Sequence, residues 1–166
     1  MSLALAAVWA VALLAGCSGG IEDPVPTVES ESPQGLPEAT QEAVDEELTA
    51  LKMNVQIGNY TFTATLEDNQ AVDELVEMME VGPVTLRLDD YSGFEKVGPL
   101  GKTLTASDSH TTTVAGDIVL YNSNNIVMFY GSNSWSYTRL GKIDDLTEWA
   151  DALGRGSITA VLTLAE

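Results

Sequence analysis

Apolar and polar residues alternate along the chain over Met53–Ile57 and again over Tyr60–Leu66. Such alternation is typical of strands that bury one face and expose the other. Gly58-Asn59, which separates the two stretches, is a sequence that two-residue β-turns favour. The pattern therefore predicts an antiparallel hairpin at the start of the folded region.

The period of the pattern changes after Asn69. Apolar residues then stand at positions 71, 72, 75, 76 and 79, which is the spacing of one face of a helix. Asn69 is a residue type that commonly caps a helix N-terminus, and Gly82-Pro83 is a sequence at which helices end. A helix is predicted between them, followed by a strand over Val84–Leu88.

Residues 90–116 show no regular period, and we predict that they are irregular. Two stretches rich in β-forming residues follow, Asp117–Tyr121 and Ile126–Tyr130, and the polar linker between them predicts a second hairpin. Many strands and few helices favour a closed or nearly closed antiparallel barrel. Three further elements are expected: a strand over Tyr137–Ile143, a short helix over Leu146–Leu153, and a strand over Ser157–Leu164.

Residues 1–16 form an uncharged apolar stretch that is shorter than the roughly 20 residues of a membrane span. Its length suits the apolar region of a signal peptide, although the usual Lys or Arg near the start is lacking. A start codon assigned too late would explain that lack. An uncleaved membrane anchor, or cleavage by another peptidase, is the alternative.

Leu14-Ala15-Gly16-Cys17 resembles the bacterial lipobox. The resemblance implies that Cys17 carries a thioether-linked diacylglycerol and that a further acyl chain, such as palmitate, is added to the new N-terminus. Two or more chains are what stable anchoring requires. The expected location is the extracytoplasmic face of a cell membrane, in the cell envelope.

The stretch between Cys17 and Lys52 differs from the rest of the chain. It contains four of the six prolines and nine acids, and no base precedes Lys52. A low hydrophobicity combined with charge of one sign predicts a disordered spacer, although Glu38–Leu51 has a composition that permits an acidic helix. The expected organisation is a signal peptide at 1–16, a lipidated tether at 17–51 and a folded domain at 52–166.

The charge and the cysteine content exclude several functions. The chain has 25 acids against 7 bases, a net charge of −18, which excludes a general binder of nucleic acid and disfavours adsorption to anionic lipids. Cys17 is the only cysteine, so neither an intrachain disulfide nor a cysteine-rich zinc site is possible. We expect a monomer without a cofactor or metal.

The order of several motifs is similar to that of the bacterial cyclophilin-like fold family. The motifs are DDYSGFEKVG at 89–98, GDIVLY at 116–121, IVMFYG at 126–131 and LGKI at 140–143. The resemblance covers about residues 52–165. It implies a mainly β fold, a closed eight-stranded antiparallel barrel with two short helices.

True cyclophilins isomerise prolyl peptide bonds with an Arg donor beside an apolar proline pocket. By strand order, the resemblance assigns these positions to Arg87 and Phe129, and Tyr121 and Tyr130 complete the candidate groove. The sequence lacks the Phe-His-Arg and Gln-x-Gly segments of those enzymes. Arg87 has the alternative role of an outward strand residue paired with Asp89 or a neighbouring acid.

Three functions remain open at this level. The first is a surface-anchored module that binds a peptide or a small molecule. The second is a prolyl isomerase of exported proteins, and the third is a structural envelope protein with a vestigial groove.

Other candidate residues have ordinary explanations. His110, the sole histidine, is a possible general base, but no second group is spaced to orient it, and a solvated loop residue is the simpler interpretation. Asp89-Asp90 and Asp144-Asp145 lack the spacing of a calcium loop. Acids that precede a helix, as Asp144-Asp145 do, favour its N-terminus.

Overall fold

The structure is a computed structural model, and it describes residues 50–166. The expectations for residues 1–49 lie outside this range. β1 (Lys52–Ile57) and β2 (Tyr60–Leu66) form the predicted hairpin, with Val55 opposite Phe62. Gly58 has a φ of +58° in the connecting turn, a left-handed conformation that glycine adopts without strain.

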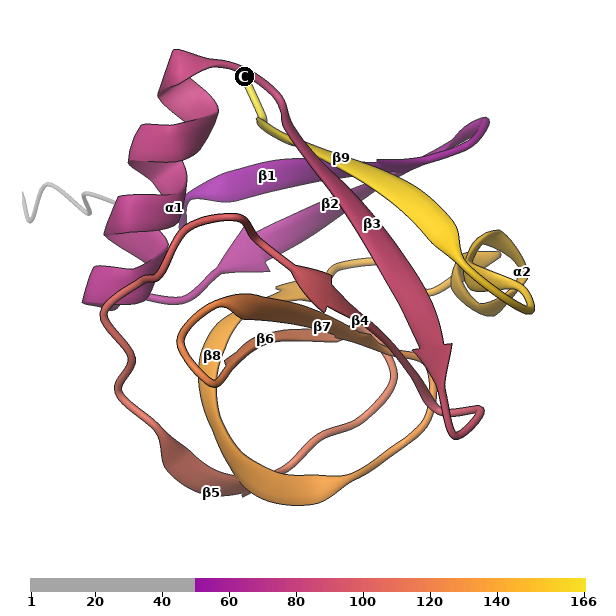
Figure 1. Cartoon of the computed structure of the whole chain (residues 1–166). Helices are drawn as coiled ribbons and strands as arrows, with labels where there is room; N and C mark the ends of the chain where they lie inside the picture. The colour runs from indigo at the N-terminus through magenta and orange to yellow at the C-terminus, as the bar shows by residue number, and fades with distance from the viewer. Residues whose placement is uncertain (1–49) are drawn as a thin grey trace, which may run out of the picture. The chain divides into compact units, whose positions relative to one another are not determined.

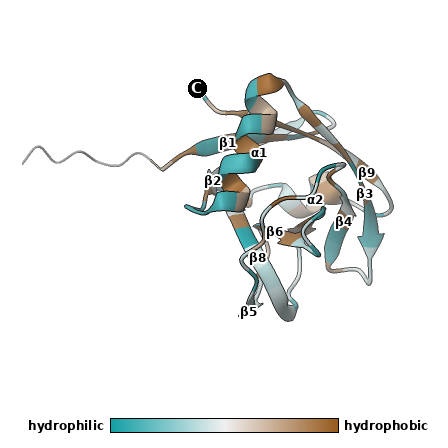
Figure 2. Ribbon diagram, turned by 60° about the vertical axis from the view of Figure 1, so that its left-hand side comes forward, coloured by the Kyte–Doolittle hydropathy of each residue, from teal (hydrophilic) through white to brown (hydrophobic). Residues whose placement is uncertain are grey.

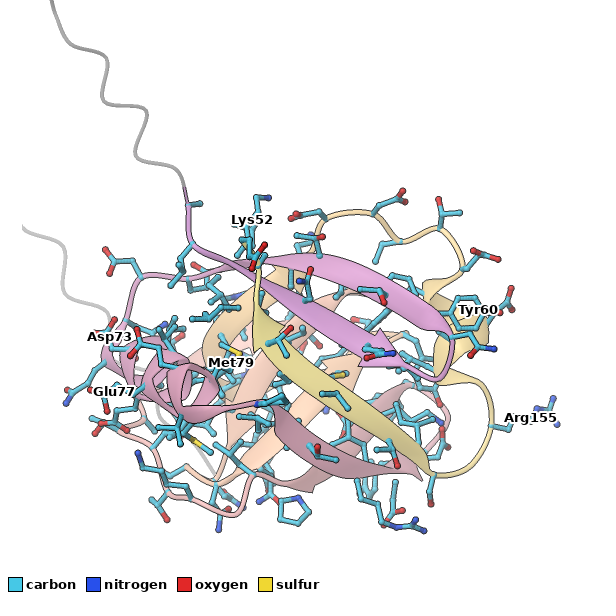
Figure 3. The ribbon with its side chains drawn as sticks, turned by 90° about the horizontal axis from the view of Figure 1, so that it is seen from above. Lys52, Tyr60, Asp73, Glu77, Met79 and Arg155 are labelled. Carbon is cyan, nitrogen blue, oxygen red and sulfur yellow. The ribbon has the colours of Figure 1, made fainter. Side chains whose placement is uncertain are left out.

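The predicted helix is α1 (Gln70–Val81), and its ends are those that the sequence indicates. The Asn69 side chain accepts a hydrogen bond from the Val72 backbone N–H at 3.2 Å, and Gly82 donates its N–H to the Met78 carbonyl. Hydrophilic and hydrophobic residues alternate along the helix (Figure 2), and its acidic side chains Asp73 and Glu77 project away from the barrel (Figure 3).

The remaining elements include two strands in the segment predicted to be irregular, residues 90–116. β4 forms there because it pairs with both β3 and β7, and β5 forms because it pairs with β8. Neither pairing leaves a local pattern in the sequence. The elements are β3 (Val84–Tyr91), β4 (Glu95–Pro99), β5 (Ser109–Thr112), β6 (Asp117–Tyr121), β7 (Asn125–Phe129), β8 (Ser134–Ile143), α2 (Trp149–Leu153) and β9 (Ile158–Leu164).

The last helix is shorter than predicted. α2 begins at Trp149 and not at Leu146, because Glu148 adopts a left-handed conformation with a φ of +62° that cannot belong to a helix. β8 in turn begins at Ser134, three residues before the predicted Tyr137, because its first residues pair with β5. Neither helix in the described part of the chain is long and apolar enough to cross a bilayer.

Eight of the strands close into an antiparallel barrel, which confirms the predicted fold class. They follow the order β2-β1-β9-β3-β4-β7-β6-β8, and β8 returns to pair with β2. β5 is an additional strand on the outer edge of β8. In Figure 1 the first half of β8 and β5 curve away from the rest of the sheet, while α1 and α2 lie at opposite ends of the barrel.

The barrel interior is the main hydrophobic core. α2 contributes Trp149, whose indole packs edge-on against Phe62 at 4.9 Å between ring centroids and donates a hydrogen bond from Nε1 to the Phe129 carbonyl at 2.8 Å. Leu86 and Leu88 point into this core, and Arg87 between them points out, as the alternation predicts. A second, smaller apolar cluster lies on the opposite face of the sheet, outside the barrel.

Candidate binding site on the outer face of the barrel

The second cluster occupies the outer face of β4, β7, β6 and β8. Strands with both faces buried are unusual in a small barrel, because one face normally meets solvent. Here β6 and β7 bury residues on both sides. The outer cluster consists of buried Val119, Val127, Phe129 and Tyr137, with half-buried Phe94, Val97 and Tyr121 packed against it.

A hollow of about 420 Å³ lies over this apolar face. Its floor comes from the barrel strands, and one wall comes from the first residues of β8, where Trp135 pairs with Thr111 of β5. A volume of this size matches the lower part of the range for small-molecule sites. The lining residues are Tyr91, Glu95, Val97, Tyr121, Val127, Asn133, Trp135 and Tyr137.

The aromatic rings around the hollow are steeply inclined to one another. The Tyr137 ring lies 6.0 Å from the Tyr121 ring at 64°, and 5.7 Å from the Phe129 ring at 71°. Because the rings meet edge to face and are not stacked in parallel, they form the walls and the floor of a concave surface. Tyr91 and Trp135 are each 57% exposed at the margin, so large apolar surfaces remain accessible in the absence of a ligand.

Asn133 fixes the position of the central ring. Its side-chain Nδ2 donates a hydrogen bond to the Tyr137 hydroxyl at 2.9 Å, and its backbone carbonyl accepts one from the Thr113 hydroxyl at 3.0 Å. Thr113 is itself fully buried. The Tyr137 hydroxyl is therefore held in place by a network that reaches into the segment after β5.

Glu95 is the one charged residue among the lining residues. It is 7% exposed, and its Oε2 is buried without a hydrogen-bond partner in the described part of the chain. Burial raises the pKa of the Glu95 carboxyl to about 7. A buried carboxyl oxygen that lacks a partner destabilises a fold, and groups with pKa values shifted in this way are frequent at functional sites.

Lys96, the next residue along β4, faces the barrel interior and is fully buried. Its Nζ donates to Asp90 Oδ1 at 2.6 Å and to the carbonyls of Gly154 and Gly156 at 2.9 and 2.8 Å. The Tyr130 hydroxyl donates to the same Asp90 oxygen. These bonds to Lys96 and Tyr130 lower the pKa of Asp90, while burial and the Asp90 bond raise the pKa of Tyr130 to about 12. The network closes one end of the barrel behind the hollow.

The comparison with protein families agrees with this architecture. The model of the Cyclophilin-like family matches residues 55–164. The chain belongs to this family. Among curated proteins, none matches. A solved structure with a similar chain is the solution structure of a hypothetical protein from Archaeoglobus fulgidus, with 12% identity, coverage of 70% of this chain and 95% of that chain, and a TM-score of 0.48.

The structure of this cyclophilin-like domain separates the four candidate groove residues. Tyr121 lines the hollow, and Phe129 lies fully buried beneath it against Tyr137. Tyr130 points to the other side of the sheet, toward Asp90 and Lys96. Arg87 is exposed on β3 outside the lining of the hollow, and it forms no ion pair with Asp89 in the described residues.

The remaining candidates have structural roles or none. His110 is exposed on β5, opposite Ser136, and not in a loop as its sequence context predicts. Asp144 accepts hydrogen bonds from Lys52 and Thr65, and Asp145 accepts one from the Thr147 N–H. Residues 50–166 contain no group of three or more His, Cys, Asp or Glu side chains that could hold a metal ion.

Of the eight residues that line the hollow, only Tyr121 was a sequence-predicted candidate, and those that were missed include Glu95, Trp135 and Tyr137. Glu95 lay in the segment predicted to be irregular, so its strand register and its face were unknown. Trp135 stands among Gly, Ser and Asn residues and gave no indication of its side. One signal was available. Tyr137 is the first residue of the predicted strand and lies two residues after Trp135, so an extension of that strand would place both side chains on the same face.

Proposed function

We propose that this cyclophilin-like domain is a binding module whose ligand, a small molecule or a peptide side chain, occupies the outer hollow. The observation that supports it is the aromatic lining. Tyr121, Tyr137 and Trp135 surround one cavity, while Tyr91 and Trp135 stay largely exposed at its margin. Aromatic surface left accessible around a concave site is characteristic of ligand sites and is disfavoured elsewhere on a small domain.

Binding without catalysis fits the lining better than prolyl isomerisation. An isomerase of this kind needs a fixed donor near the amide whose bond is twisted. The hollow has no Arg, Lys or His among its eight lining residues, and Arg87 lies outside it. A proline-containing peptide is thus expected to contact the rings, but the cis–trans isomerisation of its prolyl bond should not be accelerated.

The test uses the tetrapeptide Ala-Ala-Pro-Phe and the indole N–H signal of Trp135, assigned by its loss in Trp135→Phe. We expect the peptide to shift this signal in the wild-type chain. Val97 is a half-buried lining residue on the outer face, so Val97→Trp should fill the hollow without entering the barrel core and should abolish the shift. An unchanged shift in Val97→Trp would place the ligand elsewhere.

The same peptide separates the two functions in one sample. The exchange rate between its cis and trans prolyl isomers, measured by NMR exchange, should equal the rate without protein. Faster exchange that disappears in Val97→Trp would make the hollow an isomerase site.

We further propose that the domain is held at the extracytoplasmic face of a cell membrane by lipid on Cys17. The Leu14-Ala15-Gly16-Cys17 motif and the acidic spacer that follows support this. Labelled palmitate should enter the wild-type chain and the control Ser18→Ala in a bacterial host, and should not enter Cys17→Ala. Equal labelling of Cys17→Ala would refute the anchor.

A further inference from the structure

We propose that the outer hollow is a site for organic ammonium groups, with the Glu95 carboxylate as the counter-ion and the surrounding tyrosine and tryptophan rings as the cage. This inference rests on the proposed binding function and names the class of ligand. The ammonium can belong to a free amine or to a lysine side chain, and both present the same chemistry to the site.

The position of the Glu95 carboxyl is the first observation. Glu95 is more than nine-tenths buried and lines the hollow, and its Oε2 has no partner in residues 50–166. A carboxylate oxygen in such a place needs a donor to offset the loss of water. An N–H of an ammonium group supplies both a hydrogen bond and the opposite charge.

The rings around the carboxyl are the second observation. A cation is attracted to the face of an aromatic ring, and Trp and Tyr bind it most strongly. Tyr121 and Tyr137 present inclined rings 6.0 Å apart, and Trp135 is a further aromatic residue of the lining. A neutral apolar ligand would leave the Glu95 carboxylate buried without a partner, which is unfavourable.

The charges that face Glu95 are the third observation. From β3, β6 and β8 the residues that share the lining of the hollow with Glu95 include Tyr91, Tyr121 and Tyr137, and none of these carries a cationic group. Burial raises the pKa of Tyr137, and the negative charge of Glu95 raises it further. The cation Lys96 is adjacent in sequence, but its Nζ lies on the other side of the sheet in bonds to Asp90 and two carbonyls. Within residues 50–166 the carboxylate therefore has no counter-ion.

These relationships give the site a defined response to pH. A bound cation favours the ionised carboxylate, so affinity for an ammonium rises as pH increases through the titration of Glu95, whose pKa is about 7. A ligand that needed a donor from protonated Glu95, such as a carbonyl compound, would show the opposite trend. The sign of the pH dependence thus identifies the chemistry of the ligand.

The test compares n-butylammonium with butan-1-ol, which has the same chain and a neutral hydroxyl. The full chain is kept in a non-ionic maltoside because residues 1–16 are apolar, and binding is followed by the Trp135 indole N–H signal at pH 5.5 and pH 8. We expect butylammonium to bind about tenfold more tightly at pH 8 than at pH 5.5, and butan-1-ol to bind weakly with no pH dependence.

Two variants isolate the carboxyl. Glu95→Gln keeps the shape of the side chain and should weaken butylammonium binding at pH 8 about tenfold and remove its pH dependence. Glu77→Gln is the matched control, since it removes an exposed carboxylate that projects from α1 (Figure 3) and is not among the residues lining the hollow, and it should leave binding unchanged. N-acetyl-lysine methylamide tests the peptide source: tighter binding than butylammonium assigns the site to lysine side chains, and weaker binding assigns it to free amines.

The outcomes distinguish this inference from the proposed function. If butan-1-ol and butylammonium shift the Trp135 signal equally, or if Glu95→Gln binds butylammonium as the wild type does, the hollow binds ligands but the ammonium inference is wrong. If neither probe nor the lysine derivative shifts the signal at either pH, the ammonium inference is overturned, and a silent Ala-Ala-Pro-Phe titration would then overturn the binding function as well.

Discussion

Glu95 on β4 and Phe129 on β7 are cross-strand partners on the outer face of the barrel. The carboxyl therefore lies beside a fully buried phenyl ring, and the next pair on this face of the two strands is Val97 with Val127. An apolar residue at position 95 would suit this surface better, since a buried charge without a partner is costly. The cyclophilin-like domain thus carries a destabilising group at its candidate site.

The first prediction concerns the stability of Glu95→Gln. The pKa of Glu95 rises from an ordinary 4.5 to about 7 on folding, so the folded state holds the proton more tightly. Stability from this group is fully present below pH 4.5 and is lost as pH rises through 7. Glu95→Gln should match the wild type at pH 4.5 and be more stable by up to about 3 kcal/mol at pH 8.

Urea unfolding of both chains at pH 4.5, 6 and 8 provides the measurement. The lowered pKa values of Asp90, Asp144 and other carboxyls affect both proteins equally and cancel in the difference. Glu77→Gln, which alters an exposed carboxylate, is the control and should give only a small difference. A Glu95→Gln difference that is the same at all three values would show that the carboxyl is hydrated.

The parts of the fold that the sequence predicts are those with strong local signals. The β1–β2 hairpin and α1 have a clear period, a turn or a cap, and both form within a residue or two of the expected bounds. β4 could not be predicted in the same way. It contains Gly98 and Pro99, and its two faces carry Glu95 and Val97 outside and Lys96 inside, so no simple alternation marks it.

The same reason limits prediction of the site. The hollow depends on which face of β4 points outward and on β8 extending to Ser134 to pair with β5, and both follow from long-range pairing. Sequence parity does indicate that Phe129 and Tyr130 face opposite ways, which the structure confirms. Parity alone could not say which of the two lies under a cavity.

The second prediction concerns Lys96, the buried cation behind the hollow. Lys96→Met fills similar space but leaves the carboxylate of Asp90 and the carbonyls of Gly154 and Gly156 without their donor. Removal of one partner from a buried ion pair typically costs about 3–5 kcal/mol, and the lower end is expected because Asp90 is 30% exposed and can recover water.

The midpoint of urea unfolding at pH 7 measures this cost. Lys102→Met is the matched control, since Lys102 is exposed and its replacement should alter stability by less than about 0.5 kcal/mol. Equal midpoints for the two variants would mean that the Lys96 network contributes nothing to the closure of the barrel end.

The third prediction concerns Gly98, where β4 passes close to β3. A Cβ at this position would lie 2.1 Å from the Arg87 carbonyl oxygen, a backbone atom that cannot move without disturbing the strand. Gly98→Ala should therefore lower the free energy of unfolding by about 3 kcal/mol or more.

Thermal unfolding of Gly98→Ala should show a correspondingly lower Tm. Gly58→Ala is the comparison, because Gly58 has a φ of +58° but open space around it. It should cost only the left-handed backbone penalty of about 1 kcal/mol. A Gly98→Ala chain as stable as Gly58→Ala would mean that β3 and β4 are further apart than the structure shows.

The fourth prediction uses the contrast between two tryptophans. Trp149 is 1% exposed and bonded to the Phe129 carbonyl, whereas Trp135 is 57% exposed at the margin of the hollow. Trp149→Phe should remove emission at short wavelength that acrylamide cannot quench, and Trp135→Phe should remove emission at long wavelength that acrylamide quenches readily. Trp9 is present in both variants and cancels in the comparison.

The two substitutions should also differ in their effect on stability. Trp149→Phe loses a buried hydrogen bond and part of a core side chain, which together cost about 2–3 kcal/mol, although the Phe129 carbonyl keeps the N–H of Gly116. Trp135→Phe removes only exposed surface and should change stability by less than about 0.5 kcal/mol. If Trp135→Phe destabilises the chain as much as Trp149→Phe does, Trp135 is packed in the core. The hollow would then be closed in the ligand-free protein.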